Sequence, residues 1–502
     1  DHFFEMGGHS LLAMQVISRL RNLLGREVAL RSLFEQPRLQ GFVAALSTDS
    51  GMPLAPALVA VGRDQPLPLS YAQERQWFLW QLDPSSAAYH VPSALRLKGR
   101  LDLSALQRSF DTLVARHENL RTYLQQDGER AVQVIAEQAS VEVARVDIGA
   151  SAIRTEVESQ IARPFDLTQG PLMRASLLRV AEDDHVLVLV QHHIVSDGWS
   201  MQVMVDELVQ LYAAFSLGQA PQLPALPIQY ADYAVWQRQW MEAGEKTRQL
   251  EYWRGLLGGE QPVLELPLDH ARPSQQSHRG ASLDIQVPPA LVTELRALAQ
   301  REDVTLFMLL LASFQALLHR YSGQSDIRVG VPVANRNRVE TERLIGFFVN
   351  TQVLKADIDG QQTVAQLLAQ VKQRALDAQA HQDLPFEQLV EALQPERNLS
   401  FNPLFQVLFN HQTQASGRDE DEQLPGLHVS GLEWDNHTAQ FDLSLNTHES
   451  AEGLAASLTY ATDLFELATL ARMAAHWLNL LNGMTRDAQQ RIGQLPLLEP
   501  QE

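Results

Sequence analysis

The residues of this chain whose types and spacing could do chemistry lie together at positions 192–198. His192 and His193 are followed by Asp197 and Gly198. The unperturbed pKa of a histidine, about 6.5, suits proton transfer near neutrality. We find no Ser-His-Asp set, no metal-ligand spacing and no phosphate-binding glycine loop in the sequence. A histidine pair at the end of a strand is more often structural than catalytic, so the residue types alone leave both roles open.

Two elements must position these side chains. The apolar run Val186–Val190 predicts a buried strand, and apolar residues at helical spacing over 201–212 predict a helix beginning near Trp199. The histidines, the aspartate and the glycine then lie on a strand-to-helix turn. A buried strand end holds a base rigidly, and a glycine can adopt backbone angles closed to other residues.

The pattern His-His-x-x-x-Asp-Gly resembles the active-site motif of condensation domains of nonribosomal peptide synthetases. Further stretches resemble motifs of the same family, in the family's order, so the resemblance covers nearly the whole chain. They occupy residues 69–78, 116–122, 230–237, 332–338, 345–351, 381–387 and 402–409.

The first residues, Asp-His-Phe-Phe-Glu-Met-Gly-Gly-His-Ser-Leu-Leu, resemble the attachment site of peptidyl carrier proteins, as does Leu-Phe-Glu-Gln-Pro at 33–37. By that resemblance Ser10 carries 4'-phosphopantetheine. Ser10 also occupies an N-cap position before a helix that ends at Gly25, where the helix dipole favours a phosphodiester. Carrier proteins begin with another helix, so we expect an N-terminally truncated carrier.

The expected fold class is α/β. Strands alternate with helices along the chain, and the resemblance implies two chloramphenicol-acetyltransferase-like lobes in a V, preceded by a small all-α carrier unit. We place the carrier at 1–46, a linker rich in Pro, Gly, Ala and Ser at 47–67, the N-terminal lobe at 68–235 and the C-terminal lobe at 236–500.

The resemblance implies peptide bond formation, in which the amine of an acceptor aminoacyl thioester attacks a donor thioester. His193 then acts as general base or positions the amine, and these two roles stay open. As a base, it predicts an activity that falls as the pH drops through about 6.5. The Gly198 N–H stabilises the oxyanion, and His192 has a supporting role. Asp197 forms a structural salt bridge with Arg336.

Composition limits the partners. Lys+Arg number 40 against Asp+Glu 60, a net charge of −20 over 502 residues, which disfavours nucleic acid and anionic membranes. The absence of cysteine excludes disulfides, catalysis by a cysteine thiolate and cysteine-ligated metals. We see no signal peptide and no bilayer-length apolar run, so we expect a cytoplasmic location. The expected partners are a downstream acceptor carrier protein, synthetase domains such as an adenylation domain, and a phosphopantetheinyl transferase. The upstream carrier would deliver the donor.

Several alternatives share this fold. An epimerisation domain has the same core motif, but the continuation Gly198-Trp199-Ser200 favours condensation. An ester-forming or cyclising domain stays open. A catalytically silent recruitment scaffold would show degenerate motifs, whereas His193, Asp197 and Gly198 are intact. Cyclodehydrating relatives have an aspartate where this chain has His192. The 70–73 and 196–199 stretches favour an L-configured donor.

Overall fold

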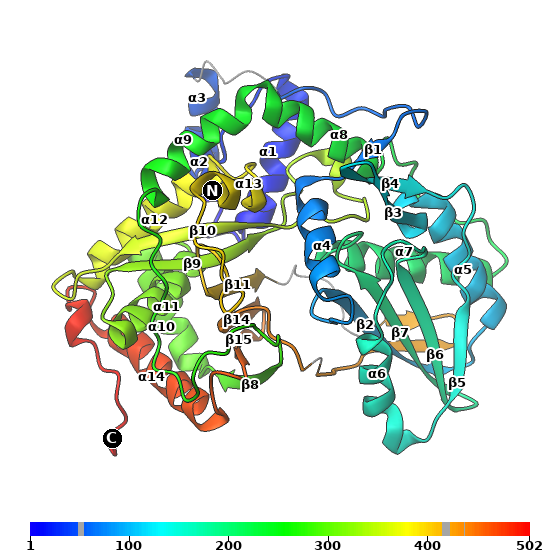
Figure 1. Ribbon diagram of the computed structural model, residues 1–502. Coiled ribbons are helices and arrows are strands. Elements are labelled where there is room, and N and C mark those ends of the chain that lie inside the picture. Colours follow the sequence, from blue (N-terminus) through cyan, green and yellow to red (C-terminus); the bar gives the residue numbers. More distant parts are fainter. Residues whose placement is uncertain (49–54, 414–421, 436) are drawn as a thin grey trace.

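The computed structural model describes residues 1–48, 55–413, 422–435 and 437–502. Two α/β lobes lie side by side, and a small helical unit, dark blue in Figure 1, packs behind them. Residues 49–54 of the expected linker lie outside the described residues. The family-typical two-lobed architecture is therefore present, with a helical unit before it.

The N-terminal unit consists of three helices, α1 Ser10–Leu24, α2 Leu30–Glu35 and α3 Leu39–Thr48. The sequence predicts Ser10 as the N-cap of the first helix, and this prediction is wrong by one residue. His9 is the N-cap, because its backbone is extended and its Nδ1 accepts the N–H of Leu12 at 3.4 Å. Ser10 is the first helical residue. The C-terminal end is as expected, since Gly25 adopts the left-handed conformation, with φ 65°.

The first lobe is built on a six-stranded sheet in the order β12-β13-β2-β7-β6-β5. β7 lies at its centre, paired antiparallel with β2 and β6, and nearly all of its residues are buried. Four of its strands are β2 His90–Gly99, β5 Val143–Asp147, β6 Met173–Ala181 and β7 Asp184–His192, and the other two, β12 Glu422–Leu424 and β13 Leu427–Gly431, come from late in the chain. Because β7 is paired on both edges and covered on both faces, its C-terminal end is a rigid support for the turn that follows.

Helices cover both faces of this sheet. α5 and α7 pack on one face, and α4 and α6 contribute to the core on the other. The helices are α4 Tyr71–Leu82, α5 Leu103–Arg116, α6 Ile153–Ala162 and α7 Gly198–Ser216, with short 3₁₀ turns η1 Glu118–Arg121 and η2 Ala150–Ala152. A small sheet, β1 Leu67–Pro68, β3 Thr122–Asp127 and β4 Arg130–Ile135, lies beside them.

The stretch at 230–237 also predicts the start of one long helix that runs to about residue 257, and in the structure this helix is interrupted. It divides into α8 Tyr230–Trp240, a π-helical turn η3 Met241–Glu245 and α9 Lys246–Leu257. The interruption falls at Gly244, whose φ of 120° is closed to a helix. The continuous helix was therefore an incorrect expectation, and Gly244 is the local reason.

The second lobe has its own six-stranded sheet, in the order β10-β9-β11-β14-β15-β8. The strands are β8 Gly280–Gln286, β9 Asp326–Val333, β10 Asn350–Asp357, β11 Val407–Thr413, β14 Leu443–Ser450 and β15 Gly453–Ala461. Its helices are α10 Pro289–Arg301, α11 Leu306–Ser322, α12 Val364–Gln379, α13 Phe386–Leu393 and α14 Leu467–Arg486, with η4 Val339–Thr341 and η5 Ile492–Gln494. The buried apolar residues of the N-terminal unit belong to the same hydrophobic cluster as this lobe.

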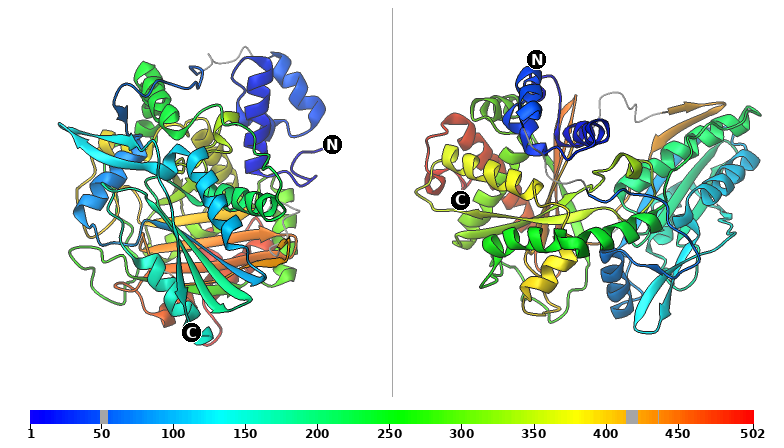
Figure 2. Two further views of the ribbon diagram at one scale, coloured as in Figure 1. Left: turned by 90° about the vertical axis from the view of Figure 1, so that its right-hand side faces the viewer. Right: turned by 90° about the horizontal axis from the view of Figure 1, so that it is seen from above.

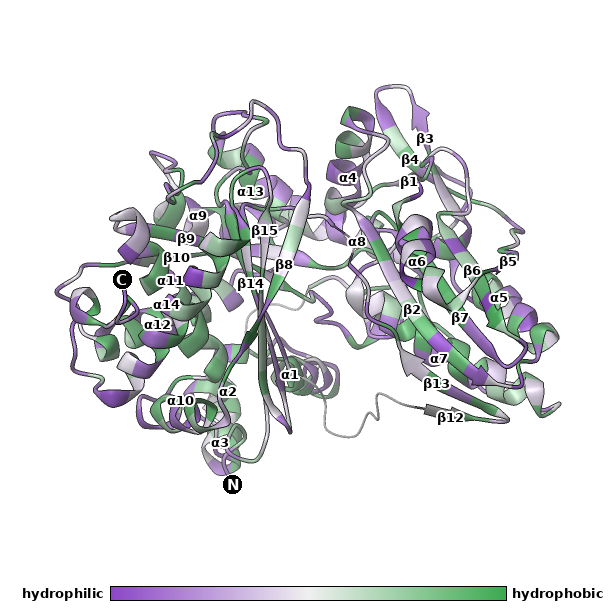
Figure 3. Ribbon diagram, turned by 90° about the horizontal axis from the view of Figure 1, so that it is seen from below, coloured by the Kyte–Doolittle hydropathy of each residue, from purple (hydrophilic) through white to green (hydrophobic). Residues whose placement is uncertain are grey.

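A late segment of the chain returns to the first lobe. β12 Glu422–Leu424 and β13 Leu427–Gly431 extend the first-lobe sheet, with β13 antiparallel to β2. The approach is close at Gly99, where φ is 123° and a Cβ would collide with the carbonyl oxygen of Gly426. A strand pair from the second half of the chain therefore completes the first-lobe sheet, and Figure 3 shows β12 and β13 at the edge of the first lobe.

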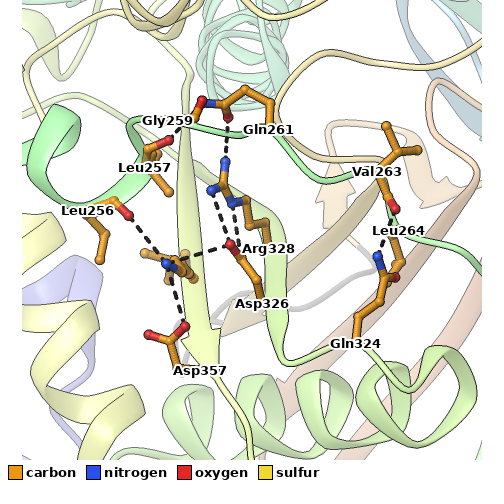
Figure 4. A network of polar contacts seen from close by, with 12 residues as sticks. Leu256, Leu257, Gly259, Gln261, Val263, Leu264, Gln324, Asp326, Arg328 and Asp357 are labelled. Atoms are coloured by element: carbon orange, nitrogen blue, oxygen red, sulfur yellow. Dashed lines mark hydrogen bonds and ion pairs between the residues drawn. The ribbon is translucent and has the colours of Figure 1, made fainter.

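Polar contacts tie the segment after α9 to the second-lobe sheet (Figure 4). The Arg328 guanidinium contacts the Asp326 carboxylate at 3.1 and 3.2 Å and the Gln261 side chain at 2.5 Å. Gln324 donates to the carbonyl oxygen of Val263 at 3.0 Å. These contacts hold the connection between α9 and β8 against the start of β9.

Hydropathy follows this arrangement. In Figure 3, hydrophobic stretches lie along the sheet strands and the covering helices, and many connecting loops are hydrophilic. No single helix of the described ranges is long and apolar enough to cross a membrane. α10 and α11 reach that length and apolar character only when taken together, and the two helices are bent by 103° relative to each other. Both contribute to the second-lobe core.

Candidate active site

The turn that carries the histidine pair is anchored on both sides. The His192 N–H donates to the carbonyl of Leu172 at 3.1 Å, and the His193 N–H donates to the carbonyl of Tyr89 at 2.9 Å. β7 ends at His192 and α7 begins at Gly198. The structure therefore brings the four motif residues onto one strand-to-helix turn, as the sequence predicts.

His193 is half-buried and neutral. Its Nδ1 lies 2.8 Å from the carbonyl oxygen of Ser196. Because a carbonyl only accepts, Nδ1 carries the proton, and the neutral ring keeps its lone pair on Nε2. Burial lowers the pKa of His193, and the Asp197 carboxylate only partly opposes this. The ring packs on Phe347, with centroids 4.4 Å apart. Geometry and charge state both fit a proton acceptor at Nε2.

His192 faces the interior instead. Its side chain is buried, and its Nδ1 accepts the N–H of Ile194 at 3.0 Å. Burial holds the pKa of His192 well below its usual value, and His90 and His193 add to the effect. The ring centroid lies 5.9 Å from that of His90 and 6.1 Å from that of Phe165, edge to face. These contacts brace the turn and keep His192 away from proton transfer.

Asp197 is a buried carboxylate with four donors. Oδ1 caps α7 by accepting the Ser200 N–H at 2.9 Å, and it also contacts Arg336 Nη2 at 3.2 Å. Oδ2 accepts the N–H groups of Phe348 and Val349, each at 3.0 Å. Burial by itself raises the pKa of Asp197, but Arg336 and the donated hydrogen bonds outweigh it, so the pKa is lowered. A carboxylate held this way is a structural anion.

Arg336 connects the second lobe to this carboxylate. Its Nη1 donates to the carbonyls of Thr341 at 2.7 Å and Leu344 at 2.6 Å, and its Nη2 donates to the Ser200 hydroxyl at 2.5 Å. A guanidinium and a carboxylate are expected to meet through two parallel hydrogen bonds, but here one nitrogen contacts one carboxylate oxygen. The reason is competition, since two carbonyls occupy Nη1 and two backbone amides occupy Oδ2.

Gly198 lies at the exposed end of the turn. A Cβ at this position would meet no atom within 4 Å, so packing within the protein does not require glycine here. The cap engages Ser200, and the Asp197 carbonyl accepts the N–H of Met201 at 3.0 Å. Neither contact uses the Gly198 amide. The first amide of α7 and the open space beside it fit a site for a developing oxyanion.

Sequence reasoning missed the loop that braces this turn from the second lobe. We call residues 337–346 the bracing loop. The Trp199 Nε1–H donates to the carbonyl of Glu342 at 2.9 Å, and Ser200 exchanges hydrogen bonds with Gly346 at 2.8 and 3.0 Å. Arg343 approaches the buried Glu207 of α7 at 3.6 Å. The sequence signals were the motifs at 332–338 and 345–351, which overlap the two ends of this loop but do not reveal its partners.

Two other motif stretches have structural roles. The Asn350 amide donates to the carbonyls of Gln382 and Leu384 at 3.2 and 2.9 Å, which ties β10 to the segment before α13. His117 Nε2 contacts Glu207 at 2.7 Å, and Arg116 Nε contacts the same oxygen at 2.8 Å. These contacts give Asn350 and the 116–122 motif structural roles in the fold.

Ser10 fits an attachment residue for phosphopantetheine. It is the first residue of α1 and is partly exposed, whereas Ser18 of the same helix is buried. The preceding loop is tight, because a Cβ on Gly8 would meet the Phe3 ring at 2.5 Å. Ser10 therefore combines accessibility to a modifying enzyme with the positive end of a helix dipole. In the described ranges, no cluster of three or more His, Asp or Glu side chains could hold a metal ion.

Comparison with known proteins agrees with this geometry. The condensation domain model matches residues 63–502, and the phosphopantetheine attachment site model matches residues 1–46. A linear gramicidin synthase of Brevibacillus parabrevis is 48% identical over the whole chain, and malpinin synthetase of Mortierella alpina is 42% identical. The chain spans 7% and 6% of the length of these two relatives.

Solved structures show the same architecture. The X-domain of teicoplanin biosynthesis, in complex with OxyB, superposes with a TM-score of 0.83 at 29% identity, over 89% of this chain and 100% of that one. The four-domain nonribosomal peptide synthetase AB3403 superposes with a TM-score of 0.79 at 26% identity, over 87% of this chain and 34% of that one. The chain belongs to the condensation-domain family of nonribosomal peptide synthetases, and a carrier domain of the kind that holds 4'-phosphopantetheine on a serine precedes its condensation domain.

Proposed function

We propose that this chain forms peptide bonds between two carrier-bound substrates. The observation that carries the proposal is a neutral His193 whose Nε2 lone pair is engaged by no residue that the structure describes, next to the amide of Gly198 on a braced turn. When bound, the phosphopantetheine arm supplies the thiol that holds a substrate as its thioester.

The reaction needs one bond to form and one to break. The acceptor amine nitrogen forms a C–N bond with the donor carbonyl carbon, and the C–S bond breaks. His193 Nε2 accepts or directs the proton of the amine, and the thiolate that leaves takes up a proton. The Gly198 amide supports the negative charge that develops on the carbonyl oxygen. Orientation of the amine could supply much of the rate enhancement, because an amine attacks a thioester readily.

The position of the carrier on the second lobe supports the proposal that the carrier delivers the donor substrate to the condensation site. Figure 2 shows α1 and α2 over the second lobe, close to the junction with the first. His9, beside Ser10, lies near enough to Glu449 and His411 for their charges to act on it. Both residues lie toward the C-terminal ends of β14 and β11. An arm on Ser10 would start beside these strand ends, and the acceptor would come from a separate carrier protein.

The wider setting is part of the proposal. We divide the chain into a carrier at 1–46, a linker at 47–67 and lobes at 68–235 and 236–500. Residues 422–431 belong to the second segment of the chain but join the first-lobe sheet. The partners are an acceptor carrier, an adenylation domain and a phosphopantetheinyl transferase that modifies Ser10. We place the protein in the cytoplasm, which cell fractionation would test.

One experiment tests the activity. The chain is loaded on Ser10 with a synthetic aminoacyl-phosphopantetheine and mixed with an acceptor carrier that holds an aminoacyl thioester. Intact-mass spectrometry should show the dipeptide on the acceptor. The Ser10→Ala variant should take up no arm and give no product. Arm uptake by Ser10→Ala would contradict the attachment site, and a loaded wild type that transfers nothing would contradict the condensation activity.

A silent recruitment domain is the second candidate. It is favoured by the structural likeness to the teicoplanin X-domain, which has been solved in complex with OxyB. Sequence identity to that domain is 29%, against 48% to the linear gramicidin synthase. The complete His193, Asp197 and Gly198 set supports catalysis. The same mass measurement separates the two functions.

A further inference from the structure

The carrier contacts the bracing loop through a set of ion pairs. Arg19 of α1 meets the Glu342 carboxylate with two contacts, at 3.0 and 3.1 Å. Arg21 donates to the carbonyl of Asn337 at 2.6 Å. Glu27, between α1 and α2, pairs with Arg338 at 3.1 Å. Three contacts from the carrier thus reach one short segment of the second lobe.

The opposite side of the same loop contacts the active-site turn. Glu342 receives Arg19 on its carboxylate, while its carbonyl accepts the indole N–H of Trp199, the residue after Gly198. Arg336, directly before the loop, contacts Asp197 and is held by carbonyls at Thr341 and Leu344. A single layer of backbone therefore separates the docked carrier from the catalytic turn.

We propose that docking of the carrier on the bracing loop positions the active-site turn, with Arg19 and Glu342 as positioning residues for condensation. This rests on the donor role proposed above, because a carrier loaded at another domain must leave its seat and return. When the carrier is away, Glu342 loses its partner and the loop loses three polar contacts. Binding linkage is reciprocal. If one conformation of the active-site turn strengthens docking of the carrier, docking of the carrier stabilises that conformation of the active-site turn.

A second ion pair of the carrier supplies a matched control. Arg31 of α2 pairs with Asp377 of α12 at 2.7 Å, away from the bracing loop. Like Arg19 with Glu342, it joins the carrier to the second lobe through a partly exposed guanidinium. Loss of either pair weakens docking, but only the Arg19 pair lies opposite Trp199. Comparison of the two ion pairs therefore distinguishes anchoring of the carrier on the second lobe from positioning of the active-site turn.

The test compares Arg19→Gln, Glu342→Gln and Arg31→Gln in the full chain. The protein is labelled with 5-fluorotryptophan, and the Trp199 signal among the 8 tryptophans is assigned with Trp199→Phe. We expect Arg19→Gln and Glu342→Gln to shift the Trp199 fluorine resonance alike, and the double variant to shift it no further. Arg31→Gln should leave the resonance in place.

A rate measurement accompanies the spectra. The donor is a soluble aminoacyl-pantetheine thioester that bypasses Ser10, and the acceptor is a loaded carrier protein. Arg19→Gln and Glu342→Gln should lower kcat by about two- to fivefold, the range for a partly exposed pair, with KM for the soluble donor unchanged. Arg31→Gln should keep the wild-type kcat.

Two outcomes overturn the proposal. An unmoved Trp199 resonance with unchanged kcat means that the interface only anchors the carrier. An equal response to Arg31→Gln means a general loosening of the carrier. If the wild type transfers no donor at all, the proposed function fails, whereas the Trp199 resonance still decides whether docking positions the turn.

Discussion

His193 combines a lone pair at Nε2 with a lowered pKa, and this changes the expected pH profile. The sequence suggested that activity would fall through about pH 6.5, the unperturbed value. Burial lowers the pKa of His193, so protonation and the loss of a base occur at lower pH. The decline should be centred below pH 6.5, measured as kcat/KM for peptide formation. A decline centred above pH 6.5 would contradict the assignment.

Substitution separates the two histidines. His193→Ala should lower peptide formation about 10²-fold or more if the ring acts as base. His192→Ala should lower it less, and should reduce thermal stability, because His192 accepts the Ile194 amide in the core. Rates are compared at equal concentrations of folded enzyme. Full activity of His193→Ala with a weakly nucleophilic acceptor would rule out a catalytic role.

The buried salt bridge between Asp197 and Arg336 should contribute to the stability of the fold. Each lies in the interior, and removal of one partner leaves the other charge buried, at a cost of about 3–5 kcal/mol. Asp197→Ala and Arg336→Ala should each lower Tm together with activity, and a double-mutant cycle should show coupling. A stable Asp197→Ala variant that has lost only turnover would indicate direct chemistry.

The Asp197 carboxylate should also make the free energy of unfolding depend on pH under acidic conditions. The folded-state pKa of Asp197 is below its unfolded value. The stability it contributes is therefore fully present above the unfolded pKa, about 3.9, and is lost as the pH falls through the folded pKa. Urea midpoints measured between pH 6 and pH 3 should fall less steeply for Asp197→Asn than for the wild type. Parallel slopes would contradict the assigned shift.

At the scale of elements, the start of α7 serves the site more than the fold. A Cβ on Gly198 meets nothing in the protein, and alanine is the better helix former. Gly198→Ala should therefore leave the free energy of unfolding within about 1 kcal/mol of the wild type while kcat falls, because the methyl group enters the space for the substrate carbonyl. Urea unfolding and the condensation assay check the two parts. Unchanged kcat would remove Gly198 from the oxyanion site.

Element boundaries show where local patterns suffice. The strand expected at 186–190 and the helix expected to begin near Trp199 match β7 and the start of α7 at Gly198, because both segments have a clear apolar pattern. The break at Gly244 escaped notice, since one glycine in a helical pattern is often tolerated. The cap at His9 was missed because histidine is a rare cap.

At the scale of the whole molecule, Tyr230 of α8 joins the lobes. Its hydroxyl lies 2.7 Å from Ser70 Oγ and donates to the Phe347 carbonyl at 2.7 Å. Tyr230→Phe removes the hydrogen bond to the Phe347 carbonyl and leaves Ser70 Oγ only its contact with the Gln73 N–H at 3.2 Å, at a cost of about 1–3 kcal/mol in urea unfolding. Tyr252→Phe is the control, because no described residue accepts or donates at the Tyr252 hydroxyl. Equal effects of the two substitutions would contradict the role of Tyr230.

Local sequence patterns were enough to identify which chemistry is present and where along the chain it lies. The histidine pair, Asp197, Gly198 and Ser10 stand at the ends of elements whose periodicity is local, so both the side chains and their supports could be read from neighbouring residues. The ordered motifs also implied the two-lobed fold, and comparison with solved structures confirmed it.

How these parts meet became visible in the folded chain. Arg336 reaches Asp197 across 139 positions, β13 crosses to β2, and the carrier docks on residues 337–342. The resemblance named the first pairing, but not its single contact or the amides that compete for Asp197. The proton on His193 Nδ1 likewise depends on the fold of the turn that brings the Ser196 carbonyl to it. Such contacts depend on packing between distant segments, and a local pattern shows that a polar group needs a partner without identifying which one it finds.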